Sequence, residues 1–191
     1  MKKKLKISFN SVVILGFVTL SFLALAINYL TRGASNQLLF MTYHSSLLSP
    51  LTYIRFFTHV LGHSGWEHFI GNMMYVLLLG PLLEEKYGSL KMLEIIGIVA
   101  LVTGIINYIF FWNVALCGAS GVVFAFILLS SFTRFKEGEI PLTFILVAII
   151  FLGQQVYYGM FMQDNISNLS HIIGGIMGAV FGFVFMKNQS P

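Results

Sequence analysis

A serine and a histidine are the residues of this sequence whose types and settings best suit nucleophilic chemistry. Ser120 lies in the run Gly118-Ala119-Ser120-Gly121, where the glycines leave room for a backbone to approach the hydroxyl. His171 is followed by glycines at every fourth position from Gly174 to Gly182. An imidazole within hydrogen-bonding distance of a serine hydroxyl can accept its proton as a general base. We therefore predict that Ser120 is a nucleophile and that His171 is its base.

Helix packing is the alternative explanation for both runs of small residues. Glycine, alanine and serine are common where membrane helices touch, and the Gly-x-Ser-Gly run taken alone favours that explanation. If the small face formed by Gly121 and Ala125 meets the glycines that follow His171, the same packing brings Ser120 within reach of His171. A histidine that only satisfies a backbone carbonyl is the other alternative, but ionisable residues inside membranes are costly and usually functional.

His68 and Asn72 could stabilise a negatively charged intermediate. They are four residues apart and therefore lie on one face of a helix. An imidazole N–H and an amide N–H aimed at one point could hold an oxyanion. The backbone N–H of Ser120, near a helix start, is a third donor. Without Ser120, the two side chains would be interpreted as a hydrogen-bonded pair between helices.

A metal site is the alternative for the histidines, because His59 and His63 are also four residues apart and His68 follows them. However, the sequence has no His-Glu-x-x-His run, and no cluster of carboxylates or thiolates joins these residues. We expect His59 and His63 to make structural hydrogen bonds that order the segment before the second helix, with no metal and no organic cofactor. His44 has no assigned role. The single cysteine, Cys117, excludes an intramolecular disulfide.

No carboxylate is placed to complete a catalytic triad. The one acid near His171 is Asp164, seven residues earlier, and the glutamates between positions 67 and 94 are expected at helix ends. We therefore predict a Ser–His dyad. Phe124, four residues after Ser120 and on the same helix face, is expected to pack on the ring of His171.

The elements that must position these residues are apolar enough to be transmembrane helices. Of the 191 residues, 57% are hydrophobic and 9% are charged, against roughly 25% charged in soluble domains. A spanning helix needs about 20 residues, so we expect an all-α membrane protein, a single domain over residues 1–191 with six transmembrane helices, the second and fourth of them short. The expected ranges are about 9–30, 68–83, 92–112, 119–133, 141–160 and 169–186, with an external loop at 31–67. The first apolar range is long for the hydrophobic region of a signal peptide, and no clear Ala-x-Ala cleavage site follows it, so we expect it to be retained.

The basic residues indicate that both ends of the chain are cytoplasmic. Only Arg32 and Arg55 then lie outside. The nine basic residues on the cytoplasmic side are Lys2, Lys3, Lys4, Lys6, Lys86, Lys91, Arg134, Lys136 and Lys187. This orientation places His68, Ser120 and His171 at the outer ends of three different helices.

Two further features follow from this orientation. The external loop contains aromatic and apolar residues, which indicates a segment lying partly in the membrane interface, with a simple spacer as the alternative. The net charge of +4 does not indicate nucleic-acid binding, because the basic residues sit at membrane borders and form no patch.

Four short motifs occur in a characteristic order along the chain. They are Arg55-Phe56-Phe57-Thr58-His59 with His63, His68-Phe69-Ile70-Gly71-Asn72, Gly118-Ala119-Ser120-Gly121, and His171 with Gly174 and Gly178. Together they resemble the motifs of the rhomboid family of intramembrane serine proteases, and Glu84 before Tyr87-Gly88-Ser89 is similar to the same family. The resemblance covers about residues 50–186. Four motifs in order are far more specific than any one of them.

The resemblance implies a six-helix rhomboid-like bundle, in a minimal bacterial form, with Ser120 as nucleophile and His171 as base. His68 and Asn72, with backbone N–H groups at Gly118 and Ser120, would form the oxyanion hole. It also implies a water-accessible cavity open to the outside and substrates that are transmembrane segments.

Two positions depart from the family pattern. Many relatives have tyrosine where this chain has Phe124, so that ring stacking is kept and the hydroxyl is lost. Relatives often carry tryptophan before the loop arginine, where this chain has Ile54.

We therefore predict a serine endopeptidase that hydrolyses peptide bonds in or near transmembrane segments of membrane proteins through an acyl-enzyme. Its expected partners are transmembrane protein substrates and the lipid bilayer, and its expected location is a bacterial inner membrane. One alternative is a catalytically inactive relative that binds membrane proteins. The other is a transporter of metal ions or solutes that uses the histidines, although the sequence lacks the internal repeat of many transporters.

Overall fold

The computed structural model describes residues 9–132, 140, 142–161 and 168–187, and the regular structure of these residues is helical. The elements in chain order are α1 (Val12–Leu30), the π-helix η1 (Asn36–Phe40), α2 (Pro50–Thr58), α3 (Trp66–Tyr87), α4 (Ser89–Phe110), α5 (Ser120–Ser130), α6 (Leu142–Phe161) and α7 (Asn168–Lys187). The predictions that lie outside the described residues concern Lys2, Lys3, Lys4, Lys6, Arg134, Lys136 and Asp164.

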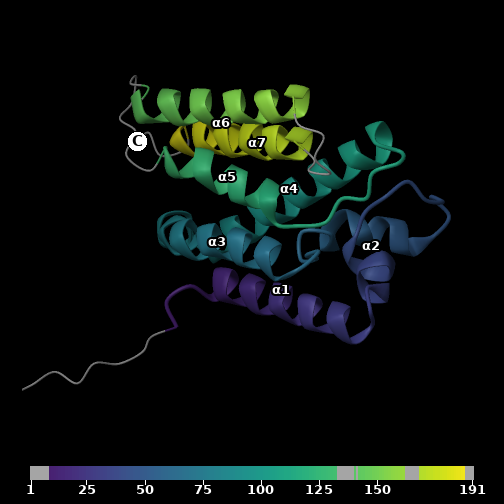
Figure 1. The fold of residues 1–191 in the computed structure, drawn as a ribbon. Coiled ribbons are helices and arrows are strands. Elements are labelled where there is room, and N and C mark those ends of the chain that lie inside the picture. Colours follow the sequence, from purple (N-terminus) through teal and green to yellow (C-terminus); the bar gives the residue numbers. More distant parts are fainter. Residues whose placement is uncertain (1–8, 133–139, 141, 162–167, 188–191) are drawn as a thin grey trace, which may run out of the picture.

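The long helices run side by side as a bundle (Figure 1). α5 packs against α7 on one side and α3 on the other, α1 packs on α3, and α6 packs on α7. α4 contacts α1, α3, α5 and α7, and therefore holds this row together from behind. The elements η1 and α2 lie at one end of the bundle, where α2 packs on α4. The core between α3, α4 and α5 contains fully buried side chains such as Val76, Ile95, Val122 and Phe126.

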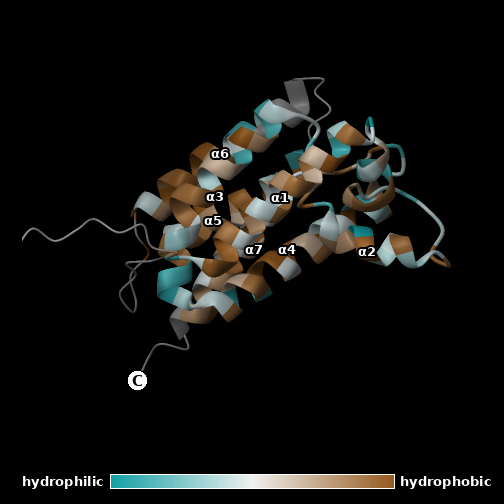
Figure 2. Ribbon diagram, turned by 90° about the horizontal axis from the view of Figure 1, so that it is seen from below, coloured by the Kyte–Doolittle hydropathy of each residue, from teal (hydrophilic) through white to brown (hydrophobic). Residues whose placement is uncertain are grey.

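Apolar side chains also cover the outer surface of the bundle. Figure 2 shows hydrophobic residues along the lengths of the helices and hydrophilic ones mainly toward the ends of the helices and near α2. On α3, for example, Leu78 and Leu82 are 63% and 61% exposed. Among the described residues, the helices long and apolar enough to cross a membrane, judged by length and composition, are Val12–Leu30, Ser89–Phe110 and Asn168–Phe185. The prediction of an all-α membrane bundle is confirmed, whereas the count of six spans stays a prediction.

α3 is longer than the range 68–83 expected from the sequence, and the prediction that it is short is wrong. It has 22 residues and ends at Tyr87. The prediction ends the helix where a charged run begins, at Glu84. In the structure Glu84 is 6% exposed, and its carboxylate accepts hydrogen bonds from the N–H groups of Val13 and Ile14, each at 3.1 Å. Two serine hydroxyls also donate to it. A buried carboxylate with these donors can stay inside a helix, because its charge is compensated. α5 is short, as expected, with 11 residues.

The segment 31–67, expected to be an external loop, contains η1 and α2. α2 begins with Pro50, whose fixed φ and missing N–H suit the first position of a helix. Arg55 is 6% exposed and donates from Nε to the carbonyl of Leu38 at 3.0 Å. Because this bond joins α2 to η1, the segment is an ordered part of the fold and not a simple spacer.

Candidate active site

The small faces of α5 and α7 meet, as the sequence predicts. A Cβ added at Gly174 would lie 2.1 Å from the carbonyl oxygen of Gly121, and one added at Gly178 would lie 2.2 Å from that of Ala125. Side chains larger than hydrogen at positions 174 and 178 would therefore push the helices apart. This contact places the first turn of α7 next to the first turn of α5.

The aromatic contact expected at this junction is also present. The ring centroids of Phe124 and His171 are 4.5 Å apart, and the rings are tilted by 48°. Phe151 of α6 lies on Phe124, with a centroid distance of 4.0 Å. The imidazole of His171 is therefore backed by two aromatic rings in series, which restrict its orientation.

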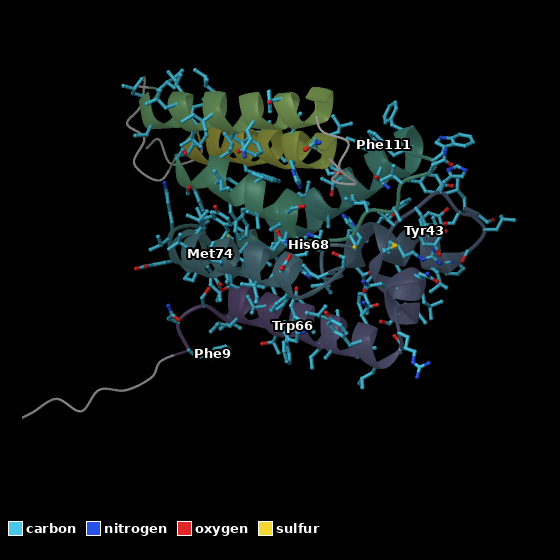
Figure 3. The ribbon with its side chains drawn as sticks, in the orientation of Figure 1. Phe9, Tyr43, Trp66, His68, Met74 and Phe111 are labelled. Carbon is cyan, nitrogen blue, oxygen red and sulfur yellow. The ribbon has the colours of Figure 1, made fainter. Side chains whose placement is uncertain are left out.

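A cavity of about 990 Å³ brings together side chains from the four helices α3, α5, α6 and α7. Its lining includes His68 and Asn72 of α3, Ser120 of α5 and His171 of α7. These four residues are the ones for which the sequence predicts a nucleophile, a base and two oxyanion donors. His68 lies at the end of α3 that is nearest to the start of α5 (Figure 3).

Two donors of α3 converge on Gly118, two residues before the serine. A Cβ added at Gly118 would lie 2.6 Å from Nε2 of His68 and 3.7 Å from Nδ2 of Asn72. Asn72 is 7% exposed, and its Nδ2 has no hydrogen-bond partner within the described part of the chain. A buried amide N–H without an acceptor is costly unless a ligand supplies one. Ser120 is the first residue of α5, and N–H groups at that position have no acceptor within their own helix.

The N–H of Gly118, a donor of the oxyanion hole according to the family resemblance, has another acceptor in the structure. Its N–H donates to the carbonyl of His59 at 2.9 Å, so it is already engaged. Its φ of +131° and its contact with the ring of His68 require a residue without a side chain. Gly118 therefore shapes the site through the space that it leaves, and the N–H of Ser120 is the backbone donor that remains.

His59 and His63 make structural hydrogen bonds, in line with the sequence prediction, and those of His59 also reach α4. Nδ1 of His59 donates to the carbonyl of Arg55 at 3.1 Å, and Nε2 lies 3.3 Å from the hydroxyl of Thr103 on α4. Nδ1 of His63 donates to the carbonyl of Leu61 at 3.1 Å. Burial lowers the pKa of each histidine from 6.5 to about 4, so both are neutral at neutral pH. Among the described residues, no group of three His, Cys, Asp or Glu side chains is arranged to hold a metal ion.

Three residues near the site are not anticipated from the sequence. The hydroxyl of Ser64 lies 3.1 Å from Nδ1 of His68, a pairing that the four-residue spacing could have suggested. Gln154 of α6 and Cys117 line the cavity. Among the described residues that line the cavity there is no carboxylate. Asp164 is not one of the residues that the structure describes.

His44, which has no role predicted from the sequence, lies away from the cavity. Its ring stacks between Tyr108 and Trp112, with centroid distances of 4.8 and 4.3 Å. Close by, Thr42 and Leu116 exchange backbone hydrogen bonds of 2.9 and 2.8 Å. These contacts attach the external segment to the loop that leads to Ser120.

A family model described as the Rhomboid domain matches residues 50–188, well over half of the chain. The chain belongs to the rhomboid family. The matched range contains all four helices that line the cavity, so the site of this rhomboid lies within the part of the chain that defines the family.

Curated proteins of bacteria and animals are similar to this rhomboid. It is 29% identical over 143 residues to the rhomboid protease GlpG of Haemophilus influenzae, covering 70% of each chain. It is 30% identical over 168 residues to the rhomboid protease GluP of Bacillus subtilis, covering 85% of this chain and 32% of that protein. It is 28% identical over 143 residues to Rhomboid-related protein 1 of Caenorhabditis elegans, covering 70% of this chain and 40% of the relative. This rhomboid therefore spans less than half the length of two of these three relatives. Membership of the family, together with the apolar helices, makes it an integral membrane protein.

Proposed function

We propose that this protein is an intramembrane serine protease that hydrolyses peptide bonds in or near transmembrane segments of other membrane proteins. One observation carries the proposal: Ser120, His171, His68 and Asn72, from three different helices, line a single cavity. The names of the bacterial relatives, rhomboid protease GlpG and rhomboid protease GluP, support the same activity.

In the proposed reaction, the hydroxyl oxygen of Ser120 attacks the carbonyl carbon of the scissile peptide bond while His171 accepts the hydroxyl proton. The oxyanion that forms accepts hydrogen bonds from Nε2–H of His68, Nδ2–H of Asn72 and the N–H of Ser120. Collapse of this intermediate breaks the C–N bond, and His171 returns the proton to the departing amine. The product of this half is an ester between the substrate and Ser120.

Hydrolysis of the ester completes the cycle. Water adds to the acyl carbon while His171 again accepts a proton, and the second tetrahedral intermediate uses the same donors. Its collapse releases the carboxylic acid and returns the proton to Ser120. The base must be a neutral imidazole in both halves, so activity is expected to fall at acidic pH. The packing of Phe124 on His171 helps to orient the imidazole.

The walls of the cavity favour a substrate that arrives from the bilayer. Between α3 and α6 the lining is mainly apolar, with Gly71, Tyr75, Val147 and Ile150. A scissile carbonyl inside an intact helix is hydrogen-bonded within that helix, so the substrate must unwind locally before Ser120 can attack it. We place the protein in a bacterial inner membrane with both termini in the cytoplasm, on the distribution of basic residues in the sequence.

Reconstitution with a transmembrane reporter tests the proposal. Wild-type protein in liposomes is expected to cleave the reporter and to react with a fluorophosphonate probe at Ser120. Ser120→Ala and His171→Ala are expected to lower cleavage by about 10⁴-fold or more. Ser131→Ala, which removes a hydroxyl at the opposite end of α5, is the matched control and is expected to cleave normally.

Two results would overturn the proposal. Reporter cleavage that persists in Ser120→Ala would exclude Ser120 as nucleophile. Folded wild-type protein that binds membrane proteins but neither reacts with the probe nor cleaves any reporter would favour an inactive, binding relative.

A further inference from the structure

The two ring nitrogens of His68 face different parts of the protein. Nδ1 lies 3.1 Å from the hydroxyl of Ser64, in the turn before α3. The opposite edge of the ring, with Cε1 and Nε2, lies against Gly118, where an added Cβ would be 2.6 Å from both atoms. One nitrogen is therefore bonded to Ser64, and the other faces the loop that carries Ser120.

This division matters because a neutral imidazole has one N–H and one lone pair. If the proton of His68 is on Nε2, the ring donates toward the loop that carries Ser120. If the proton is on Nδ1, the ring presents a lone pair there, which would repel an oxyanion. The tautomer of a histidine is set by the hydrogen bond that its other nitrogen makes. For His68 that other nitrogen is Nδ1, and its partner is the hydroxyl of Ser64, which can either donate to Nδ1 or accept from it. When this hydroxyl donates, the proton of the imidazole is on Nε2.

The neighbouring ring of His63 does not supply an alternative partner for Nδ1 of His68. The two rings are edge-on, with centroids 5.1 Å apart. Nδ1 of His63 is already committed to the carbonyl of Leu61 at 3.1 Å, and its Nε2 is buried with no hydrogen-bond partner among the described residues. His63 therefore restrains the ring of His68 by packing, and Ser64 provides its hydrogen bond.

We propose that Ser64 is a positioning residue of the oxyanion hole: its hydroxyl donates to Nδ1 of His68 and thereby keeps the proton of that imidazole on Nε2, facing the nucleophile. The inference rests on the proposed protease function and extends it to a residue outside the four sequence motifs. Ser64 acts through His68 and does not itself contact the reacting atoms. Because the oxyanion exists only in the tetrahedral intermediates, Ser64 affects kcat and leaves KM nearly unchanged.

Kinetics of five variants test this role. Ser64→Ala is expected to lower kcat by about three- to tenfold, the value of one hydrogen bond, and Ser64→Thr is expected to restore it. In a His68→Ala background, Ser64→Ala is expected to cause no further loss, since it has nothing left to position. Thr19→Ala is the control, because that exposed hydroxyl bonds only within α1, to the carbonyl of Leu15 at 2.8 Å.

Nitrogen NMR of protein labelled with ¹⁵N-histidine provides a readout that does not depend on catalysis. The wild-type spectrum is expected to show His68 protonated at Nε2, with the signal assigned by its absence in His68→Ala. In Ser64→Ala, the population protonated at Nδ1 is expected to rise. Because the side chain of Ser64 is exposed, Ser64→Ala is expected to have the thermal unfolding midpoint of the wild type, which would show that the fold is kept.

The two proposals can fail separately. Two results with an active wild type would contradict the role of Ser64 without affecting the protease proposal. One is a normal kcat of Ser64→Ala. The other is an equal loss of activity on Ser64→Ala in the wild-type and His68→Ala backgrounds. If the wild type does not cleave, the protease proposal fails. The NMR result then still decides the tautomer, and protonation of wild-type His68 at Nδ1 would overturn the inference in either case.

Discussion

Gly174 of α7 lies against the backbone of Gly121 of α5 so closely that a Cβ at position 174 would be 2.1 Å from the Gly121 carbonyl oxygen. Gly121 directly follows the candidate nucleophile, and Gly174 lies three residues after the candidate base. The spacing of these two backbones therefore controls the distance between Ser120 and His171. Membrane helices lack a hydrophobic driving force for association, so this close contact is also a large part of what holds α5 and α7 together.

Gly174→Ala is expected to separate the two helices. The variant should lose about 1–3 kcal/mol of stability from overpacking, and its kcat/KM should fall at least about tenfold because the dyad is misaligned. Gly97→Ala on α4 is the control, since a Cβ there meets nothing within 4 Å. Unfolding in detergent and reporter cleavage would be measured for both. Equal stability and activity of the two variants would show that the glycine contact does not set the site.

Gly118→Ala should damage catalysis more than stability. The new methyl group would lie 2.6 Å from the ring of His68, on a backbone with φ of +131°. Displacement of one oxyanion donor is expected to lower kcat by about 10²–10³-fold, and the strained backbone should cost about 1–3 kcal/mol. Gly33→Ala is the control, because Gly33 also has a positive φ, of +94°, but a Cβ there meets nothing within 4 Å. This variant should therefore lose stability and keep the wild-type kcat. A Gly118→Ala variant with normal kcat would exclude the proposed position of the oxyanion hole.

Phe124→Ala removes the ring that lies 4.5 Å from His171. An aromatic pair is worth about 0.5–1.5 kcal/mol, so kcat is expected to fall about three- to tenfold, with Phe124→Tyr retaining most activity. Phe110→Ala, at a side chain that is 69% exposed, serves as the control. The measurement is single-turnover cleavage of the reporter in liposomes. An undiminished rate in Phe124→Ala would mean that another group orients the imidazole.

Glu84→Ala is expected to destabilise the fold without changing the chemistry. The carboxylate of Glu84 accepts hydrogen bonds from backbone N–H groups of α1 and from the hydroxyl of Ser89 of α4. Nearby, Lys86 donates to the carbonyl of Phe132, which follows the end of α5 opposite to Ser120. These bonds lie far from the candidate site. Loss of hydrogen bonds to a charged group should cost at least about 2 kcal/mol. The exposed pair Lys91–Glu94, 2.6 Å apart, supplies the control, because Glu94→Ala should cost about 0–1 kcal/mol. Chemical unfolding in micelles would compare them, and a Glu84→Ala curve that coincides with that of Glu94→Ala would contradict the assignment.

Acidification is expected to destabilise the protein between pH 6.5 and 4. His59 and His63 have a pKa of 6.5 when unfolded and about 4 in the fold, because burial disfavours their charged forms. The unfolded chain therefore binds more protons than the folded protein in this pH window, so the free energy of unfolding falls as the pH falls. Above pH 6.5 the contribution of these two histidines no longer changes with pH. Each histidine can contribute on the order of 3 kcal/mol across the window. Unfolding of the inactive Ser120→Ala protein at several pH values measures the slope, which His59→Gln should reduce. A free energy of unfolding that stays constant from pH 7.5 to 5 would refute the expectation.

The features that depend on local spacing were predictable from the sequence. Apolar runs identified α1 and α3 to α7, although not η1 and α2. The four-residue spacing of Gly121 with Ala125 and of Gly174 with Gly178 identified the two faces that meet. The positions of Phe124 and His171 relative to these faces then predicted their contact. These features follow from the period of an α-helix, which depends on neighbouring residues alone.

Other features depended on partners distant in the sequence, and only the tertiary structure decided them. A charged residue such as Glu84 is expected at the end of a membrane helix. In the structure it lies inside α3, because N–H groups of α1, about seventy residues earlier in the chain, donate hydrogen bonds to its carboxylate. The N–H of Gly118 was a candidate oxyanion donor by its position near Ser120. In the structure it donates to the carbonyl of His59, in the external segment, at 2.9 Å. A hydrogen bond or a buried charge is satisfied by whichever group the fold brings near, and no local pattern records which group that is. The sequence therefore singled out Ser120, His171, His68 and Asn72 as the candidate site. The tertiary structure brought their helices to one cavity and, through the carbonyl of His59, engaged the N–H of Gly118.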